Sequence, residues 1–330
     1  MINKILTSTV IVITFLISSQ NVSANTVNPT DEAAQPCIKA YYGIGQPVDY
    51  AKAYKCFNSL NVYQFLILMQ LNGDGVPASV DKARKLMKEW QASEPETFIM
   101  RSFPDDSRVL KILNSRTTRI PPSPRIDFCN DFAFFGFEYR FCSSLDNTLS
   151  EQKTNKAWAA IRAILPSKDT VLWDQIVKLF DDYVNAEGKR GEDAYGEGTM
   201  APTGYDNQQI DVRKSFLTFA QSTFINMKLP PATRVQLSSA EAAMKRAYDS
   251  DIAWYAEGED YQDPNAKSFL SKSKTDLAAS QKIWIDLRDK CSELAVSLYR
   301  KKAGINWEIS LKYEMTLVRT EDIKRSTSAF

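Results

Sequence analysis

The sequence predicts an all-α fold in which short N-terminal helical hairpins precede a C-terminal helical bundle. Apolar residues between Asp276 and Lys302 recur at intervals of three, four and seven, without Gly or Pro, as on one face of a helix. A glycine turn near the N-terminus recurs thirty residues later, as in arrays of helical hairpins. No stretch sustains the alternation of apolar and polar residues that is typical of a strand.

Residues 1–24 have the pattern of a signal peptide. Lys4 supplies a positive charge, Ile5 to Ile17 form a short apolar run, and Val22-Ser23-Ala24 is a small-residue cleavage site. The apolar run is too short for a transmembrane helix and no second one follows, so we expect no membrane insertion after cleavage. The mature chain is expected to begin at Asn25, in the periplasm or outside the cell.

The composition disfavours nucleic acid as a partner and removes the commonest hydrolytic chemistry. The chain has 41 Lys and Arg against 40 Asp and Glu, and loss of Lys4 leaves it formally neutral. It has no histidine, which excludes Ser-His and Cys-His nucleophile pairs and His-ligated zinc sites. We therefore expect no cofactor, no metal and no enzyme activity. A hydrolase with paired carboxylates is the least favoured alternative, because nothing singles out a pair.

Residues 25–120 are expected to hold two helical repeats and a connector. The stretches YGIGQPVDYAKAYKCF from Tyr42 and NGDGVPASVDKARKLM from Asn72 share two glycines, a proline, a lysine and an alanine at a spacing of thirty. The glycines allow a tight turn between helices, and the alanine allows neighbouring helices to pack closely. A nucleotide-binding loop is a weaker interpretation, since no strand precedes the glycines.

This pattern resembles the Sel1-like repeat, a helical hairpin related to TPR arrays. The resemblance covers about residues 37–92, and between the two turns Tyr63 to Leu71 forms a strongly apolar helix. It implies protein–protein interaction. Because solenoids need about three units to bury a core, we expect the two repeats to pack against the rest of the chain.

A proline-rich connector separates the repeats from residues 121–330, the predicted second domain. It contains Pro95, Pro104 and the run from Pro121 to Pro124, where we place the boundary, and one short helix over Val109 to Leu113. An unusually aromatic segment then runs from Phe128 to Cys142. Core packing is the favoured interpretation of its rings, and an exposed patch for a partner is the alternative.

Three apolar stripes follow. The first ends at Pro166, the second runs from Leu172 to Tyr183, and the third runs from Ile210 to Met227. Between the second and the third, the glycine-rich stretch from Ala186 to Asp206 predicts a loop.

A fourth helix is expected to start near Ala240, with Ser238 and Ser239 as N-caps. A break from Gly258 to Pro264 leads into the long helix predicted between Asp276 and Lys302. A last helix is expected from Trp307 to Lys324.

The last two helices carry the pattern Q-x-x-W-x-x-x-R-D-x-C, followed about 25 residues later by L-x-R-T. The matching residues are Gln281, Trp284, Arg288, Asp289 and Cys291, then Leu317, Arg319 and Thr320. From spacing alone, an amphipathic core helix is the simpler explanation. The residue types resemble the LprI-type family of lysozyme inhibitors. Further similarities are the two cysteines before Asp146, Gly198-Thr199 and Phe216-Leu217.

Five cysteines fit an oxidising compartment. Cys37 and Cys56 form one sequence-local pair, Cys129 and Cys142 form another, and Cys291 is left over. In cysteine-rich relatives of Sel1 proteins, a disulfide at the place of the first pair staples one hairpin. LprI-like chains usually have a partner for Cys291 near the last helix, and this chain has none there. Cys291 is therefore either a buried free thiol, which we favour, or the partner of Cys129 or Cys142.

Acidic residues gather in two places. The first is AEGEDYQDP, with Glu257, Glu259, Asp260 and Asp263, which together with Asp249 and Asp251 forms a stretch from Tyr248 to Ala266 without Lys or Arg. The second contains Glu187, Glu192, Asp193 and Glu197. Solvated loops are the simpler interpretation, and a surface that attracts a basic protein is the functional one. Calcium binding is disfavoured, because the EF-hand spacing is absent.

The resemblances together imply an exported binding protein that inhibits lysozyme-type peptidoglycan hydrolases by occlusion. Its expected partner is a protein, with a basic lysozyme as the first candidate and Glu257, Glu259, Asp260 and Asp263 as the expected contact residues. The alternative is an envelope scaffold that holds other proteins together through its repeats.

Overall fold

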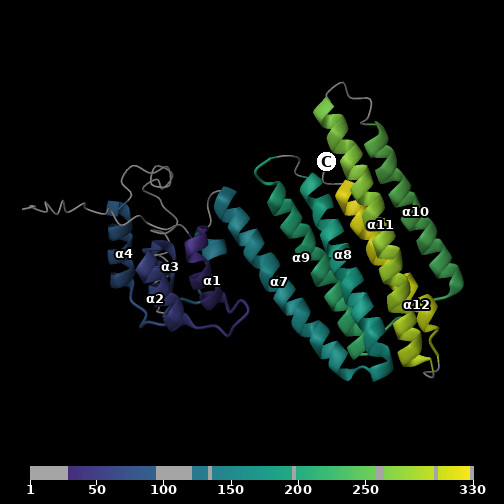
Figure 1. Ribbon diagram of the computed structural model, residues 1–330, viewed down its shortest axis with the longest axis horizontal. Coiled ribbons are helices and arrows are strands. Elements are labelled where there is room, and N and C mark those ends of the chain that lie inside the picture. Colours follow the sequence, from purple (N-terminus) through teal and green to yellow (C-terminus); the bar gives the residue numbers. More distant parts are fainter. Residues whose placement is uncertain are drawn as a thin grey trace, which may run out of the picture.

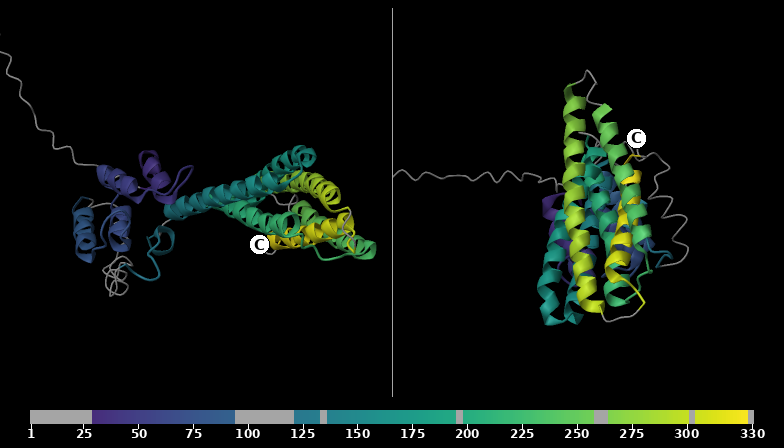
Figure 2. Two further views of the ribbon diagram at one scale, coloured as in Figure 1. Left: turned by 90° about the horizontal axis from the view of Figure 1, so that it is seen from below. Right: turned by 90° about the vertical axis from the view of Figure 1, so that its right-hand side faces the viewer.

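The computed structural model describes residues 29–93, 121–132, 136–194, 198–257, 264–300 and 304–327. Within these ranges all regular structure is helical and no strand occurs, which confirms the predicted all-α class. Four short helices lie at one end of the molecule and a bundle of long helices lies at the other (Figures 1 and 2). The predicted signal peptide and the helix predicted over 109–113 lie outside the described residues.

The N-terminal unit consists of two helical hairpins. Its elements are η1 (Glu32–Ala34), α1 (Gln35–Tyr42), α2 (Tyr50–Leu60), α3 (Tyr63–Asn72) and α4 (Val80–Ser93). Helix α3 lies at the centre, and every residue from Gln64 to Asn72 is buried. This complete burial explains why α3 is apolar on all sides.

The thirty-residue repeat of the sequence is also a repeat of backbone geometry. Gly43 and Gly73 end α1 and α3 with φ angles of 70° and 78°, in the left-handed region that glycine adopts readily. The next amide in each turn reaches back to the helix at the same place: Ile44 donates to the Lys39 carbonyl and Asp74 to the Met69 carbonyl, both at 3.0 Å. The two turns are therefore built by the same hydrogen bonds.

The core of the hairpins takes in residues from beyond the proline run. The Phe65 ring stacks between Phe57 and Phe128, with centroids 4.5 and 4.8 Å away. Phe128 belongs to η2 (Phe128–Phe132), a single π-helical turn, and Cys142 and Leu145 of α7 (Gly136–Ile164) complete the same core. The expectation that the two repeats pack against the rest of the chain is thereby confirmed.

Helix α7 joins the two units. Its first half packs on the hairpins, while Trp158 and Ile161 in its second half belong to the core of the bundle. Gln152, near its middle, donates to the Gly43 carbonyl at 2.9 Å and accepts from the Gly45 amide at 3.4 Å. One continuous helix thus contacts the first repeat turn and the bundle.

The bundle contains five further long helices and two short elements. They are η3 (Ser167–Asp169), α8 (Thr170–Ala194), α9 (Ala201–Ala220), η4 (Gln221–Ile225), α10 (Arg234–Glu257), α11 (Pro264–Tyr299) and α12 (Trp307–Thr327). Helix α8 packs between α9 and α11, α7 covers α9, and α12 packs on α10 and α11.

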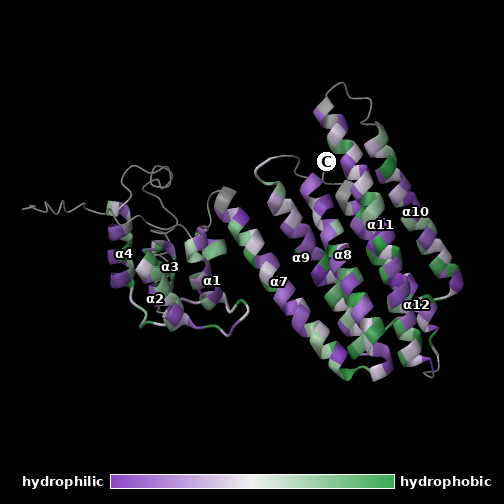
Figure 3. Cartoon of the chain, in the orientation of Figure 1, coloured by the Kyte–Doolittle hydropathy of each residue, from purple (hydrophilic) through white to green (hydrophobic). Residues whose placement is uncertain are grey.

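The bundle interior is apolar at one end and polar at the other. Trp158 contacts Trp173, Phe180 and Phe216 edge-on, with ring centroids 5.3 to 5.8 Å apart. Figure 3 shows hydrophobic residues near the end where α7 meets α8, whereas hydrophilic residues prevail along the other half of α8 and α9. The polar half holds the cluster described below.

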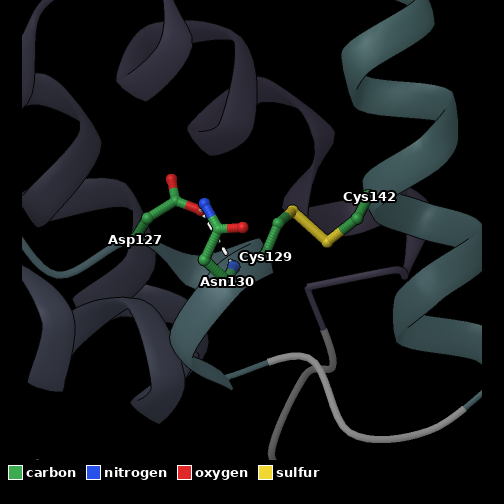
Figure 4. Close-up of a disulfide and its surroundings, with 4 residues drawn as sticks. All are labelled: Asp127, Cys129, Asn130 and Cys142. Atoms are coloured by element: carbon green, nitrogen blue, oxygen red, sulfur yellow. Dashed lines mark hydrogen bonds between the residues drawn. A yellow bond between two sulfur atoms is a disulfide. The ribbon is translucent and has the colours of Figure 1, made fainter.

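Both predicted local cysteine pairs are disulfides. Cys37 of α1 is bonded to Cys56 of α2, and Cys129 of η2 is bonded to Cys142 of α7. Figure 4 shows the second disulfide, beside which the Asp127 carboxylate accepts from the amide and the side chain of Asn130 at 3.0 Å. The first disulfide therefore joins the two helices of the first hairpin, and the second joins η2 to the first half of α7.

The aromatic segment is only partly a core element. Phe128 and Phe132 are buried and Phe141 packs against them, whereas Tyr139 is exposed. The side chains of residues 133–137, three phenylalanines among them, are outside the described set.

The prediction of a loop from Ala186 to Asp206 was wrong. Helix α8 continues to Ala194 and α9 begins at Ala201. Three of the glycines in this stretch, Gly188, Gly191 and Gly204, lie inside the two helices where they pack on each other. A Cβ atom on Gly191 would lie 2.4 Å from the Gly204 carbonyl oxygen of α9, so only glycine lets the two helices approach this closely.

The predicted N-cap of the fourth helix was also wrong. Helix α10 begins at Arg234, which places Ser238 and Ser239 inside it. The Gln236 side chain accepts from the Thr233 amide at 2.8 Å, and Thr233 Oγ1 accepts from the Gln236 amide at 3.2 Å. This reciprocal arrangement is a capping box, and its N-cap Thr233 lies five and six residues before the predicted N-caps Ser238 and Ser239.

Candidate functional site

The acidic segment predicted to contact a partner joins α10 to α11. Glu259, Asp260 and Asp263 lie outside the described residues, and of Glu257 only the backbone is described, at the end of α10. Helices α10 and α11 extend beyond α8 and α9 at this end of the bundle (Figures 1 and 2). The segment therefore connects the ends of a projecting helical hairpin.

The projecting hairpin has a small core of its own. Tyr255 of α10 packs with Leu270 and Leu277 of α11, and all three are buried. Trp254, next to Tyr255, is partly exposed with its ring 5.0 Å from the Tyr255 ring. These contacts hold the two helices together up to the start of the acidic segment.

A buried polar cluster connects α8, α11 and α12. Arg319 Nη1 donates to Glu187 Oε1 at 2.8 Å, and both side chains are 0% exposed. Arg319 also donates to the Tyr183 hydroxyl at 2.9 Å, the Ser280 hydroxyl at 3.0 Å and Gln281 Oε1 at 3.0 Å. The Ser280 hydroxyl in turn donates to Glu187. One guanidinium group is thereby held by side chains from two other helices.

Arg190 extends this cluster to α10. Its Nη1 donates to Glu187 Oε2 at 2.9 Å, and its Nη2 donates to Asp251 Oδ2 at 3.3 Å. One turn beyond, buried Asp193 accepts from Lys272 of α11 at 2.6 Å. The interpretation of Glu187, Asp193 and Asp251 as parts of acidic loops was therefore wrong, because their charges are neutralised inside the bundle.

The electrostatics of the cluster keep it ionised. Burial would raise the pKa of Glu187, but the positive charges of Arg190 and Arg319 outweigh burial and lower the pKa to about 2. Burial would lower the pKa of Arg319, and the Glu187 carboxylate raises it instead. Two arginines face two carboxylates, Glu187 and Asp251, so the four buried charges compensate one another.

Two residues of the helical motif, Gln281 and Arg319, belong to this cluster. Gln281 is buried on α11, and its side chain accepts from Arg319 and lies 3.6 Å from the sulfur of Met244 on α10. Sequence spacing placed Gln281 off the apolar stripe, and its partners explain why it is nevertheless buried. Gln281 from the first part of the motif and Arg319 from the second thus contact each other.

Three motif residues further along α11 form a second contact with the neighbouring helices: Trp284, Arg288 and Asp289. The Arg288 guanidinium lies 5.2 Å from the ring centroid of buried Trp284, and it pairs with Glu241 of α10 at 3.1 Å and with Asp289 at 3.2 Å. Asp289 also lies 3.6 Å from Lys312 of α12. The motif as a whole thus fixes α11 against α8, α10 and α12.

Cys291 is a buried free thiol, as favoured from the sequence. Burial raises the pKa of its thiol, so the thiolate needed for nucleophilic chemistry is disfavoured. Among the described residues no group of three or more Cys, Asp and Glu is arranged to hold a metal ion.

The sequence analysis missed the buried cluster although a signal for it was present. The apolar stripe Trp173, Ile176, Phe180, Tyr183 continues at the same steps of three and four to Glu187 and Arg190. The nearby glycines Gly188 and Gly191 resemble helix breakers, and they hide the polar continuation of this stripe.

No protein-family model, no curated protein and no solved structure matches this chain. Within the described ranges, no helix has an apolar run long enough to cross a membrane. What the chain does must therefore be argued from its own residues and geometry.

Proposed function

We propose that this chain is an exported binding protein that inhibits lysozyme-type peptidoglycan hydrolases by occluding their substrate cleft. The observation that carries the proposal is the projecting α10–α11 hairpin, whose ends are joined by the segment with Glu257, Glu259, Asp260 and Asp263. The four carboxylates of this segment are complementary in charge to a basic enzyme.

The buried cluster supports this role by holding the hairpin in place. Asp251 near the end of α10 is tied to α8 through Arg190, and Ser280 of α11 is tied to α8 and α12 through Glu187 and Arg319. A segment presented on helices fixed in this way loses less conformational entropy on binding than one on a free loop. The resemblance of the motif to LprI-type inhibitors is consistent with such a framework.

The proposed location is the periplasm or the extracellular space. Two disulfides are typical of proteins that mature in an oxidising compartment. The signal-peptide pattern of residues 1–24 agrees with this location.

The test is an activity assay of c-type and g-type lysozymes with the purified chain from Asn25, at low and at high salt. A variant with Glu257→Gln, Glu259→Gln, Asp260→Asn and Asp263→Asn removes the charge of the acidic segment. A control variant with Asp81→Asn, Asp286→Asn, Glu293→Gln and Glu308→Gln removes the same charge from exposed positions elsewhere. We expect inhibition that weakens with salt, is lost in the first variant and persists in the second.

Absence of inhibition of both enzymes at a large molar excess would overturn the proposal. Equal loss of inhibition in both variants would show that net charge alone matters, and it would remove the acidic segment from the mechanism.

The alternative is an envelope scaffold that binds through its helical hairpins. The observation in its favour is that the two repeats form a core with η2 and the first half of α7, that a disulfide joins α1 to α2, and that Val48 in the first repeat turn is 50% exposed. A scaffold should retain its partners in pull-downs when the acidic segment is neutralised, and lose them when Val48→Asp is introduced.

A further inference from the structure

A groove lies between α9 and α12 on the bundle. Helix α9 packs on α7 and α8, whereas α12 packs on α10 and α11. Between α9 and α12 lie a deeper pocket and a more open one, which share Ser215 of α9 and Val318 of α12. Tyr183 of α8 and Trp284 of α11 reach the deeper pocket and form its floor. The two helices are therefore the walls of a groove whose floor is supplied by the helices beneath.

The inner surface of the groove is apolar. The α9 wall contributes Val212, Phe216 and Phe219, and the α12 wall contributes Met315 and Val318. At the open edge of α12, Leu317 is 38% exposed and Val318 is 41% exposed. Adjacent exposed apolar residues that continue into a buried apolar floor are a feature of interaction sites.

The edges of the groove are predominantly acidic. Asp211 of α9 and Glu321 and Asp322 of α12 line the two pockets, and Lys214 is the basic residue among the lining side chains. Glu321 pairs with Lys324 at 2.9 Å. Glu314 lies one helical turn before Val318 on the same face of α12, and burial raises the pKa of its carboxyl group. In the described part of the chain neither Asp211 nor Glu314 has an ion-pair partner.

We propose that this groove is the docking site for a basic amphipathic helix of a partner protein. Apolar side chains at positions i, i+3 or i+4, and i+7 of such a helix would enter the groove, and flanking Lys or Arg side chains would face Asp211, Glu314 and Asp322. Asp211 to Phe219 covers about 12 Å along α9, which matches two to three turns of a partner helix. The inference is independent of the proposed lysozyme inhibition, because it uses none of the residues of the acidic segment.

The probe is a fluorescein-labelled peptide of about 18 residues, or five helical turns, made of Leu and Lys with Leu on one face. Binding to the full chain is measured by fluorescence anisotropy. A second peptide has the same composition in an order that gives no apolar face, and a third replaces Lys by Glu. We expect the first peptide to bind at least about tenfold more tightly than either of the others.

The decisive variant is Val318→Asp, with Val235→Asp as its control. Val235 lies on α10, is 80% exposed and lines neither pocket of the groove, so the same charge is added outside the proposed site. We expect V318D to weaken binding about tenfold or more although it adds a negative charge, and V235D to leave it unchanged. Ser215→Trp should weaken binding to a similar degree, because it fills the groove from the α9 wall.

Three results would overturn the inference. Binding of the basic peptide to V318D and S215W as tightly as to the original chain would show attraction by charge alone. Equal affinity for the peptide without an apolar face would show the same. A concentration-dependent dimer in sedimentation velocity, abolished by V318D, would make a second copy of the chain the occupant. Circular dichroism of both variants excludes unfolding as the cause of any loss.

Discussion

Arg319 of α12 and Glu187 of α8 form an ion pair in which both side chains are completely buried and Nη1 lies 2.8 Å from Oε1. The chain contains an ion pair of equal length at the surface, between Lys290 and Glu293 of α11. The two pairs differ in burial and in the number of further hydrogen bonds. They allow the contribution of the buried cluster to be measured against an exposed reference.

We predict that Arg319→Met lowers the free energy of unfolding by about 3 to 5 kcal/mol, because it leaves buried Glu187 with one of its two arginines and Ser280 with one polar partner fewer. Lys290→Met should lower it by less than about 1 kcal/mol. Denaturant unfolding followed by circular dichroism measures both. If the two substitutions cost the same, the cluster does not hold the helices together.

The pKa of Glu187 makes a second prediction, on acid stability. Its folded pKa of about 2 lies below the ordinary value of 4.5, so its contribution to stability is complete above pH 4.5 and is lost as the pH falls through 2. The loss amounts to about 3 kcal/mol between pH 6 and pH 2. Because Glu187→Gln cannot undergo this change, the stability difference between the original chain and E187Q should shrink by that amount.

Exposed Glu293 provides the control for this measurement. Glu293→Gln removes a carboxylate from an ion pair that is exposed to solvent, so it shows how much any loss of a glutamate charge changes the measurement. A difference between the original chain and E187Q that varies with pH no more than the difference for E293Q would mean that Glu187 does not titrate as inferred.

The local helical architecture could be predicted from the sequence where apolar spacing and turn chemistry agree. The equivalence of Gly43 with Gly73, the apolar helix α3, and the last helix from Trp307 all follow from local pattern. The glycines of α8 and α9 could not be interpreted in the same way. Gly191 and Gly204 look like loop residues, and only the close approach of α9 to α8 explains them as helix contacts.

The buried cluster could not be predicted from charge composition. Glu187 and Arg319 are separated by 132 residues, and Arg190 and Asp251 by 61. Each carboxylate therefore looks solvated in its local segment and becomes buried only when distant helices meet. The sequence shows which residues carry a charge. Whether that charge is solvated by water or paired with another side chain depends on the tertiary contacts.

Matched glycines in the two repeat turns give a third prediction. Gly45 and Gly75 occupy the same repeat position with φ angles of 68° and 69°, so alanine strains both backbones by about 1 to 2 kcal/mol. A Cβ atom at Gly45 would meet nothing within 4 Å, whereas one at Gly75 would lie 2.5 Å from the Tyr50 carbonyl oxygen. Gly75→Ala should therefore lower the melting temperature clearly more than Gly45→Ala. Equal shifts would show that the backbone of Tyr50 moves away at little cost.

The thiol of Cys291 gives the last prediction. It is completely buried and burial raises its pKa, so neither access nor ionisation favours reaction with a thiol reagent. The folded, unreduced chain should show no thiol that reacts rapidly with Ellman's reagent, and one should appear on unfolding in guanidinium. Reduction before unfolding should expose all five cysteines. Peptide mapping of the single thiol decides the pairing: label on Cys291 agrees with the two local disulfides, and label on Cys129 or Cys142 would mean that Cys291 is bonded to the other.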